Sequence, residues 1–548
     1  MMFARSLSSG RGPRRPRILR NVVLLASGAG CGLGAYHYLR ASATERRKMR
    51  VAVEGVGRFF RSISVGLLIS LDYWWTTRGL DEESDEYETA AAPVHQRSAD
   101  RIVSGALKNG GLYIKLGQGL GCFNQVLPRQ YIDTLKTLQD KALARKSGEL
   151  DLLFMEDFGQ LPSQLFASLN PEPVAAASLA QVFKAVTKDN REVAIKAQYI
   201  DLRDRYEGDI WTIKTLLKLV AIVHPRFSLS WIFEELRETL AEELDFEHEA
   251  HNLEQCGRDL RELPFVYVPH VHWKLTSKRV LTAEWIDGCK SSDRESIQRM
   301  GLSLADVARK VITTFSHQIF LTGFVHGDPH PGNVLIRPAP HNNKTAQVVL
   351  LDHGLYTRLE EEMRVSLCKM WKSIVKNDLN VIQNEAQKLG VEDYELLAVM
   401  LTSRSIATHK KMLGIANSML TKEDVEAVKN TFFQFDGVMK VLRALPTSMI
   451  IILRNINIVR SVSRELGAPV NRFNIMAKSA IHGASLSTDP SQRTWRGSVS
   501  SWVEAVNFDF RLMWLSVKLW WSVNTLRAMR LVGLMPPGSV LLEQAMLA

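Results

Sequence analysis

The most informative run of this 548-residue chain is Gly323-Phe324-Val325-His326-Gly327-Asp328-Pro329-His330-Pro331-Gly332-Asn333. Two prolines and a glycine shape a tight loop, which suits a site whose side chains are held in place. Asp328 and Asn333 stand five residues apart, and they pair a carboxylate that can lie near an acceptor oxygen with an amide that can bind a metal ion. A plain turn-rich loop, or a metal site built on His326 and His330, would use the same residues.

A second polar segment, Leu351-Asp352-His353-Gly354, follows directly after a predicted strand. That strand, residues 347–351, forms a predicted hairpin with residues 334–337 through the polar loop 341–345. Protein kinases place their catalytic loop H-R-D-x-x-x-x-N and their metal-binding D-F-G segment in this order. The separation of Asp328 from Asp352 by a hairpin therefore favours phosphoryl-transfer chemistry over a histidine metal site.

Two segments farther upstream fit the same chemistry. Val193-Ala194-Ile195-Lys196 ends a predicted strand, where kinases carry a lysine that pairs with the α- and β-phosphates of ATP. Glu249 lies on a long acidic helix, where kinases carry the glutamate that pairs with this lysine. Each segment alone has a simpler explanation, namely an exposed strand lysine and a solvated acidic helix face.

The remaining pattern predicts a small sheet with inserted helices, followed by a helical lobe that carries a β-hairpin. Predicted strands are 182–186, 192–197, 271–275 and 279–285; predicted helices are 95–146, 147–170, 203–222, 230–258 and 304–322, with more helices beyond 360. This order predicts an α+β, two-lobed protein kinase-like fold with an N-terminal helical extension and a mostly helical C-terminal region.

These residues closely resemble the UbiB/aarF-domain atypical kinase-like family, and in detail its animal aarF-domain kinase branch. Lys115-Leu116-Gly117-Gln118 fits the K-x-G-Q motif of that family, in an N-terminal helical extension. Ala175-Ala176-Ala177-Ser178-Leu179-Ala180-Gln181 fits its alanine-rich nucleotide loop, and Glu243 and Asp245 fit its E-x-D motif. The H-x-D-P-H-P-G-N run at residues 326–333 is the most specific match.

The resemblance implies ATP and Mg²⁺ as cofactors and a role for each matched residue. The implied catalytic residues are Asp328, Lys196 and Glu249, and the implied metal ligands are Asn333 and Asp352. The implied nucleotide-binding residues are Ala175, Ala176, Ala177, Ser178, Lys196 and Glu284. The implied regulatory residues, which hold the helical extension over the expected substrate groove, are Lys115, Gln118, Glu243 and Asp245.

Departures from ordinary kinases limit the predicted activity. Gly327 replaces the catalytic-loop arginine, His330 replaces a lysine, and an alanine loop is stiffer than a glycine loop. A helical pattern near Glu360 follows Gly354 closely, which leaves little room for a peptide-binding activation segment. We therefore predict an atypical kinase or ATPase with an unknown small-molecule, lipid or protein substrate. The family resemblance implies a setting in lipid metabolism of the quinone type. The alternative is a nucleotide-binding pseudokinase scaffold with little turnover.

The N-terminus differs from the rest in charge. Residues 1–50 hold eleven of the 69 Lys and Arg but one of the 58 Asp and Glu, so they carry nearly all of the net charge of +11. The remainder shows no basic stripe with interleaved aromatics, so no nucleic acid is predicted as a partner. The Arg- and Ser-rich residues 1–20 are typical of mitochondrial targeting. Residues 21–39 lack charge and predict a transmembrane helix.

These features together predict a single-pass membrane protein of mitochondria, with membrane lipid as a partner. The pairs Gly28/Gly32 and Gly30/Gly34 would permit a homo-oligomer through the span. A basic, Trp-rich stretch at 502–534 predicts either an interfacial membrane helix or a helix packed on the kinase-like domain. Five scattered cysteines without a C-x-x-C pair predict free thiols.

The predicted domain organisation follows from these segments. It comprises a basic targeting segment at 1–20, a transmembrane helix at 21–39, a linker and helical extension at 40–146, an atypical kinase-like domain at 147–400 and a helical C-terminal region at 401–548.

Overall fold

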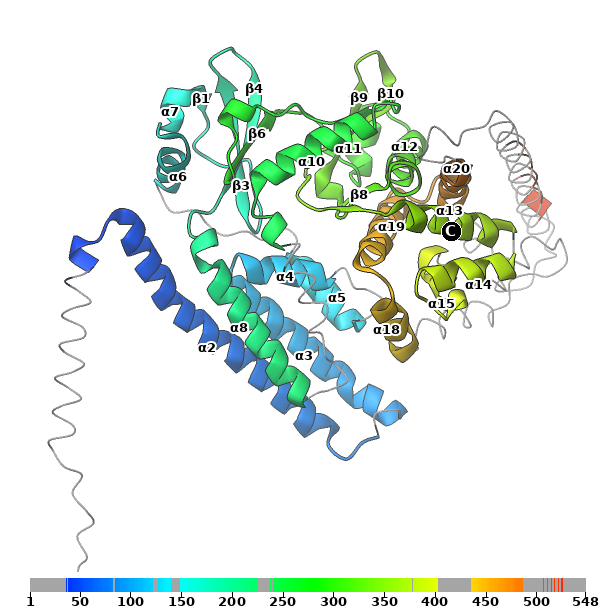
Figure 1. Ribbon diagram of the computed structural model, residues 1–548, viewed down its shortest axis with the longest axis horizontal. Coiled ribbons are helices and arrows are strands. Elements are labelled where there is room, and N and C mark those ends of the chain that lie inside the picture. The colour runs from blue at the N-terminus through cyan, green and yellow to red at the C-terminus, as the bar shows by residue number, and fades with distance from the viewer. Residues whose placement is uncertain are drawn as a thin grey trace, which may run out of the picture.

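The computed structural model describes residues 38–81, 84–121, 127–138, 148–223, 240–376, 378–402 and 435–485, with the single residues 36, 237, 506, 510, 514, 517, 521, 524 and 525. Two lobes and a helical extension make up this part of the chain (Figure 1). A small sheet and its helices form the N-terminal lobe, and a larger, mostly helical body forms the C-terminal lobe. The predicted α+β, two-lobed kinase-like fold is confirmed.

The N-terminal lobe is built on a five-stranded antiparallel sheet. Its strands are β1 (Phe166–Leu169), β2 (Ala175–Ala176), β3 (Ala180–Thr187), β4 (Glu192–Gln198) and β6 (Val280–Glu284), in the order β1-β3-β4-β6 with β2 paired to β3. Alternate residues of β3 and β4, such as Phe183 and Ile195, are buried against Phe154 of α6 (Glu149–Phe158). Their neighbours, among them Lys196, therefore face the other side of the sheet.

Two of the helices predicted for this part of the chain, 147–170 and 230–258, differ from those of the structure. α8 (Leu202–Val223) matches the prediction, but the predicted helix 230–258 is interrupted before α10 (Phe246–Asp259). The Asp245 side chain accepts hydrogen bonds from the backbone N–H groups of Glu247 and His248, so it caps a new helix. Residues 166–169, predicted as helix, instead form β1, whose backbone pairs with β3.

The C-terminal lobe surrounds a large apolar core with helices and carries the predicted hairpin. The hairpin is β9 (Val334–Ala339) and β10 (Asn342–Leu350), flanked by β5 (Val266–Tyr267) and β7 (Cys289–Lys290) in a four-stranded sheet. A two-stranded sheet of β8 (Phe324–His326) and β11 (Tyr356–Arg358) lies beside it. The predicted strand at 271–275 is wrong, because Trp273–Leu275 form the short 3-10 helix η3 and only Val271 pairs with the sheet.

The helices of the C-terminal lobe pack around one continuous apolar core. They are α11 (Arg294–Arg299), α12 (Leu304–His317) with the π-helical turn η4 (Gln318–Thr322), α13 (Glu361–Lys376), α14 (Leu379–Lys388), α15 (Tyr394–Thr402), α18 (Phe435–Ala444), α19 (Thr447–Glu465) and α20 (Arg472–Ser485). Phe315, Trp371, Ile456 and Ala480 belong to the same buried cluster, so α19 and α20 are part of this core.

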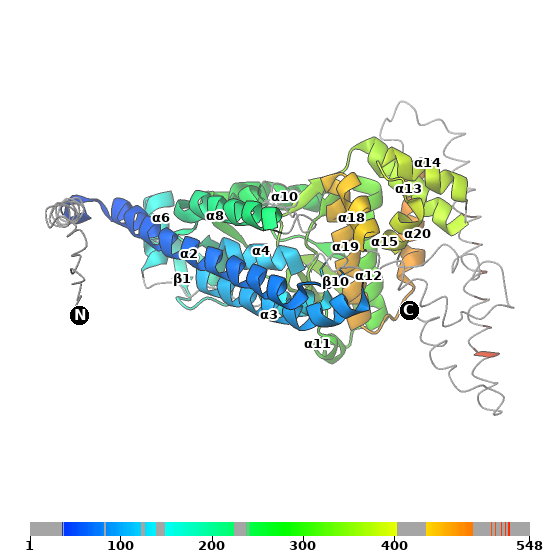
Figure 2. The same ribbon diagram turned by 90° about the horizontal axis from the view of Figure 1, so that it is seen from below.

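The extension is a helical bundle beneath the two lobes (Figures 1 and 2). It comprises α2 (Ala43–Thr77), α3 (Asp85–Asn109), α4 (Leu112–Gly121) and α5 (Arg129–Leu135), with the short helix η1 (Lys136–Leu138). α2 packs along α3 and α8. The Arg58 side chain of α2 and the Asp209 side chain of α8 form a buried ion pair of 2.8 Å. Residues 43–77, which fall within the predicted linker and helical extension at 40–146, are one long helix.

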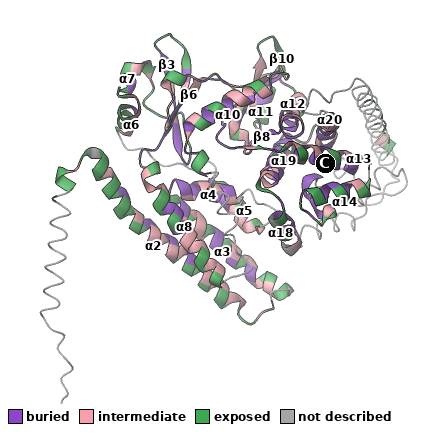
Figure 3. Ribbon diagram, viewed as in Figure 1, coloured by how far each residue is buried: buried purple, intermediate pink, exposed green. Residues whose placement is uncertain are grey.

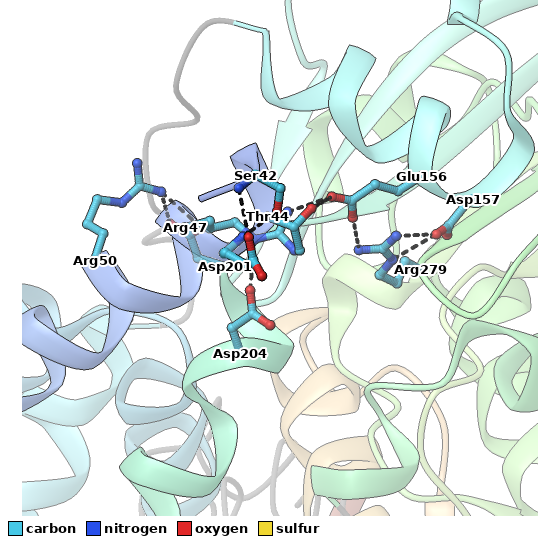
Figure 4. Close-up of polar contacts among 10 residues, drawn as sticks. Ser42, Thr44, Arg47, Arg50, Glu156, Asp157, Asp201, Asp204 and Arg279 are labelled. Atoms are coloured by element: carbon cyan, nitrogen blue, oxygen red, sulfur yellow. Dashed lines mark hydrogen bonds and ion pairs between the residues drawn. The ribbon is translucent and has the colours of Figure 1, made fainter. Parts of the chain in front are cut away.

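The basic residues that begin α2 fasten it to the N-terminal lobe. Arg47 lies 2.9 Å from Glu156 of α6 and 2.8 Å from Asp204 of α8, and Arg50 lies 3.2 Å from Asp201 (Figure 4). Arg279 of the N-terminal lobe also pairs with Glu156 and with the neighbouring Asp157. Arg47 and Arg50, which follow the predicted span at 21–39, thus take part in intramolecular ion pairs.

The prediction of a single-pass membrane protein is wrong for the part of the chain that the structure describes. Among the helices that the structure describes, none combines the length and the apolar character needed to cross a bilayer. α2 is long enough, but its first turns are charged and Arg58 and Asp72 lie farther along it. The predicted span at 21–39 lies, except for Tyr36, Tyr38 and Leu39, outside the described residues, and so does the basic segment 1–20.

The C-terminal stretch at 502–534 is described at seven positions only. Among these, Val506, Phe510, Trp514, Val517 and Trp521 are 44–66% exposed. Neither predicted role of this stretch is tested. Cys256 and Cys368 are buried free thiols and Cys289 is a half-buried one, while Cys31 and Cys122 lie outside the described residues.

Candidate active site

The β9–β10 hairpin places Asn333 and Asp352 side by side. Asn333 directly precedes β9, Asp352 follows β10 by one residue, and the antiparallel register pairs Val334 with Leu350. The backbone N–H of Leu351 donates to the Asn333 carbonyl oxygen at 3.0 Å, which extends the pairing to the edge of the site. Two segments far apart in sequence thus meet because one hairpin returns the chain to its starting edge.

Lys196, Glu249 and Asp352 form a connected ionic group between the lobes. The Lys196 Nζ atom lies 2.7 and 2.9 Å from the two carboxylate oxygens of Glu249 and 3.3 Å from Asp352 Oδ1. Burial alone would lower the pKa of Lys196, but the two carboxylates outweigh it and raise that pKa. Burial would likewise raise the pKa of Asp352, but Lys196 and Lys115 hold it well below its usual value. Lys196 is therefore a fixed cation.

Asp328 is held by a residue that the sequence analysis did not identify. Arg454 of α19 lies 3.3 Å from Asp328 Oδ1, and both side chains are at most a quarter exposed. Burial would raise the pKa of Asp328, but Arg454 and Lys115 lower it, so the carboxylate is ionised. The Asn333 side-chain N–H donates to the Asp328 carbonyl oxygen at 3.1 Å, which ties the two ends of the loop together. No motif around Arg454 signals this role, because only the tertiary packing of α19 brings it here.

Two of the four predicted regulatory residues lie beside the ionic group, and the other two bind the backbone of nearby helices. The Lys115 Nζ atom lies 2.8 Å from Glu243, and its charge acts on both Asp328 and Asp352. The Gln118 side chain donates to the Leu138 carbonyl oxygen at 2.9 Å, so it fastens α4 to the short helix η1. Asp245 caps α10. Lys115 and Glu243 therefore border the ionic group, while Gln118 and Asp245 act on the backbone around it.

The alanine loop forms the turn between β2 and β3. Ala175 and Ala176 pair with Val182 and Gln181, and the Ala177 N–H donates to the Ala180 carbonyl oxygen at 2.8 Å. Ser178 is buried, whereas the three alanines are exposed. The loop does without the left-handed backbone that glycine would permit, since within the described chain positive φ angles outside glycine occur only at Asn190 and Ala468.

Glu284 lies at the end of β6, and its carboxylate accepts a hydrogen bond of 2.6 Å from the Tyr267 hydroxyl. This bond leaves part of the carboxylate for another partner. The nucleotide-binding role predicted for Glu284 stays a prediction, as do the roles of the alanine loop.

The histidines of the loop accept hydrogen bonds from its backbone N–H groups. His326 Nδ1 accepts from the Asp328 N–H at 3.0 Å, and His330 Nδ1 accepts from the Gly332 N–H at 3.2 Å. His353 contacts the Tyr356 hydroxyl and the Leu350 carbonyl oxygen, and burial together with His326 lowers its pKa to about 3. The alternative of a histidine metal site is not favoured, because the backbone N–H groups of Asp328 and Gly332 already use the Nδ1 lone pairs of His326 and His330.

The residues that remain fit a magnesium ion. Asn333 uses its amide nitrogen toward Asp328, so its amide oxygen is left for a metal, and Asp352 supplies a carboxylate beside it. Mg²⁺ in phosphoryl-transfer sites takes one or two such oxygen ligands and completes its shell with phosphates and water. Within the described ranges no cluster of three or more His, Cys, Asp or Glu forms an all-protein cage. Asn333 and Asp352 would hold such an ion together with a nucleotide.

We expect Lys115→Met to change nucleotide affinity or turnover by about tenfold without unfolding the protein, because a charged hydrogen bond of this kind is worth about 1.5–3 kcal/mol. The measurement is steady-state ADP release with nucleotide titration. Lys136→Met, at an exposed ion pair of η1, is the matched control and should leave both quantities unchanged. Wild-type affinities and rates in Lys115→Met would contradict an active-site role for this lysine.

Comparison with known proteins agrees with this geometry. The ABC1 atypical kinase-like domain matches residues 137–386. The chain is 39% identical over 426 residues to "Probable serine/threonine-protein kinase abkD" of Dictyostelium discoideum, with 78% of this chain and 61% of that protein covered. It is 34% identical over 470 residues to AarF domain-containing protein kinase 1 of Gallus gallus, and the match covers 85% of this chain and 89% of that protein. It is 37% identical over 414 residues to the protein of that name in Mus musculus, and the match covers 75% of this chain and 78% of that protein. The predicted resemblance is therefore confirmed, and the chain belongs to the ABC1 (AarF) family of atypical kinase-like proteins.

Proposed function

We propose that this chain is a Mg²⁺- and ATP-dependent phosphotransferase that acts as an ATPase or on a small-molecule or lipid acceptor. The ionic group of Lys196, Glu249 and Asp352, beside Asp328 and Asn333, is the observation that carries the proposal. A quinone-type lipid pathway is the setting that the family resemblance suggests.

Each residue would have a defined task. Lys196, held by Glu249, would orient the α- and β-phosphates, and Asp352 and Asn333 would hold the metal ion, which neutralises charge that develops on the phosphates. Asp328, kept ionised by Arg454, would accept a proton from an acceptor hydroxyl or orient a water molecule. Arg454 would supply the positive charge that is missing at Gly327 and His330 in the loop itself.

The chain between the metal site and the next helix argues against a peptide substrate. α13 begins at Glu361, only a few residues after Gly354, and three of the intervening residues form β11, which pairs with β8. No length remains there for the extended segment on which kinases bind peptides. This supports a water, small-molecule or lipid acceptor.

Steady-state ADP release by purified protein with Mg-ATP, with and without lipid, tests the proposal. Asp328→Asn should lower the rate about 100-fold or more while nucleotide binding persists, because a positioned proton acceptor contributes 10²–10⁴-fold. Arg454→Met should slow turnover as well, and Arg464→Met, a neighbour on the same helix, is the control. Nucleotide binding without turnover in the wild type would favour the pseudokinase scaffold instead.

A further inference from the structure

α2 carries an apolar stripe along its outer side that no other described part of the chain covers. The helix buries Val51, Arg58 and Ser62 against the rest of the extension. On the opposite side, large apolar residues are 50–78% exposed: Val53, Phe60, Leu67, Leu71, Trp74 and Trp75. α2 runs along the edge of the molecule, with exposed residues on its free side (Figure 3). We call these six residues the α2 stripe.

The α2 stripe has the spacing of a helix–helix seam. Val53, Gly57, Phe60, Ser64, Leu67, Leu71 and Trp74 follow one another in alternating steps of four and three residues. This heptad spacing is the pattern by which two long helices pack side by side. With 35 residues, α2 is about 52 Å long, so the seam covers most of its length.

Charges are missing from this face because the helix turns them inward. Between Glu54 and Asp72 the only charged residues are Arg58 and Arg61. Arg58 is buried against Asp209, and Arg61 donates to the Asn109 side chain at 2.6 Å. A solvated helix carries charged residues on its outer face, so a charge-free outer face indicates an apolar partner.

The two ends of the α2 stripe are opposite in charge. Arg46 and Lys48, together with Glu45, are exposed at the start of α2. Asp85, Glu86 and Glu88, together with Arg78, which stacks on Trp74, are exposed next to the end of α2. An antiparallel copy of the helix would set each basic end against an acidic end. We propose that the α2 stripe is the interface of an antiparallel homodimer, in which α2 of one copy packs along α2 of a second copy.

The heptad pattern also specifies a register. In an antiparallel seam with two-fold symmetry, Phe60 lies opposite Leu71 of the second copy, Ser64 opposite Leu67 and Gly57 opposite Trp74. A Cβ atom added at Gly57 would meet nothing within 4 Å other than the adjoining backbone of α2, so the position leaves room for a tryptophan from outside. Large residues thus meet small or matching ones along the seam.

A bilayer surface is the competing occupant, and the acidic end disfavours it. Anionic headgroups attract basic residues and would repel Asp85, Glu86 and Glu88. A second copy of the chain satisfies both ends at once. Trp211 of α8, which stacks on Phe59 at 5.5 Å and is 60% exposed, would widen the same contact.

Light scattering on the full chain after size exclusion tests the dimer. The wild-type protein should have twice the mass of one chain, and Leu67→Glu should weaken association about 100-fold, to a folded monomer with unchanged nucleotide binding. Leu152→Glu, at a 50% exposed leucine of α6, is the matched control and should remain a dimer. Lys48→Glu and Glu86→Lys should each weaken the dimer, and the double variant should restore it.

Three outcomes would overturn the proposal. A wild-type monomer that sediments with phosphatidylcholine–phosphatidylserine vesicles, and stops doing so as Leu67→Glu, would assign the stripe to a bilayer surface. A wild-type monomer that dimerises after removal of residues 486–548 would assign it to the C-terminal segment of the same chain. A dimer that survives Leu67→Glu would place the interface elsewhere.

Discussion

Asp352→Asn is expected to remove most of the thermal stabilisation that Mg-nucleotide gives this protein. A ligand present at about 100 times its dissociation constant stabilises the folded state by about 2.7 kcal/mol, which corresponds to several degrees in Tm. Asparagine can still accept the hydrogen bond that Asp352 Oδ1 receives from the Gly354 N–H, so the turn should hold. The variant loses the carboxylate that we propose for the metal ion, which is also one of the two carboxylates beside Lys196.

The measurement is Tm with and without Mg-ATP, with chelation of Mg²⁺ in the wild type as a second route to the same loss. Lys196→Ala should behave like Asp352→Asn, because it removes the cation for the phosphates. Asp189→Asn, in the exposed hairpin turn of the same lobe, is the control and should keep the full shift. An unchanged shift in both site variants would overturn the site assignment.

Asp209→Leu is expected to destabilise the attachment of α2 to α8 by about 3–5 kcal/mol, the usual cost of removing one member of a buried ion pair. Asp209 is 2% exposed and 2.8 Å from Arg58, and Arg205 also acts on it. Its loss leaves the buried guanidinium group of Arg58 and the half-buried one of Arg205 without this carboxylate. The loss should appear as a lower Tm and as earlier proteolysis within α2.

The double variant Arg58→Met/Asp209→Leu separates charge from packing. Because it removes the Arg58–Asp209 pair as a whole and fills the same space with apolar atoms, it should regain most of the stability that Asp209→Leu loses, apart from the share due to Arg205, which still lacks this carboxylate. Asp133→Leu, at a side chain that is 71% exposed on α5, is the control and should change stability little. A double variant as unstable as Asp209→Leu would show that the pair contributes hydrogen-bonding geometry that methionine and leucine cannot replace.

The elements that the sequence predicted well are those with a local cause. The β3–β4 and β9–β10 hairpins, α8, and α12 continued by η4 follow from hydrophobic periodicity and turn residues, and the structure has them close to the predicted bounds. The catalytic-loop and metal segments were recognisable because each is a compact motif. The structure brings Lys196 to Glu249 and Asp352, although the functional roles of these residues stay predictions.

The features that the sequence analysis missed depend on contacts between residues that lie far apart in the sequence. α2 was hidden because its pattern mixes an outer apolar seam with inner arginines, and the partners of those arginines lie more than a hundred residues away in α8. The helix break at Asp245 depends on a cap that only folding selects. Arg454 belongs to an otherwise ordinary helix, and the packing of α19 against the loop alone makes it a neighbour of Asp328.

The position of α19 also determines how the protein can be divided for expression. The Asn455 side chain donates to the His326 carbonyl oxygen at 2.6 Å, next to the Arg454–Asp328 pair, while Lys115 reaches the same centre from the opposite end of the chain. A fragment limited to the matched residues 137–386 would lose all three residues. The smallest fragment that keeps this centre together therefore extends at least from α4 to α19, and a shorter one would report the behaviour of an opened, incomplete centre.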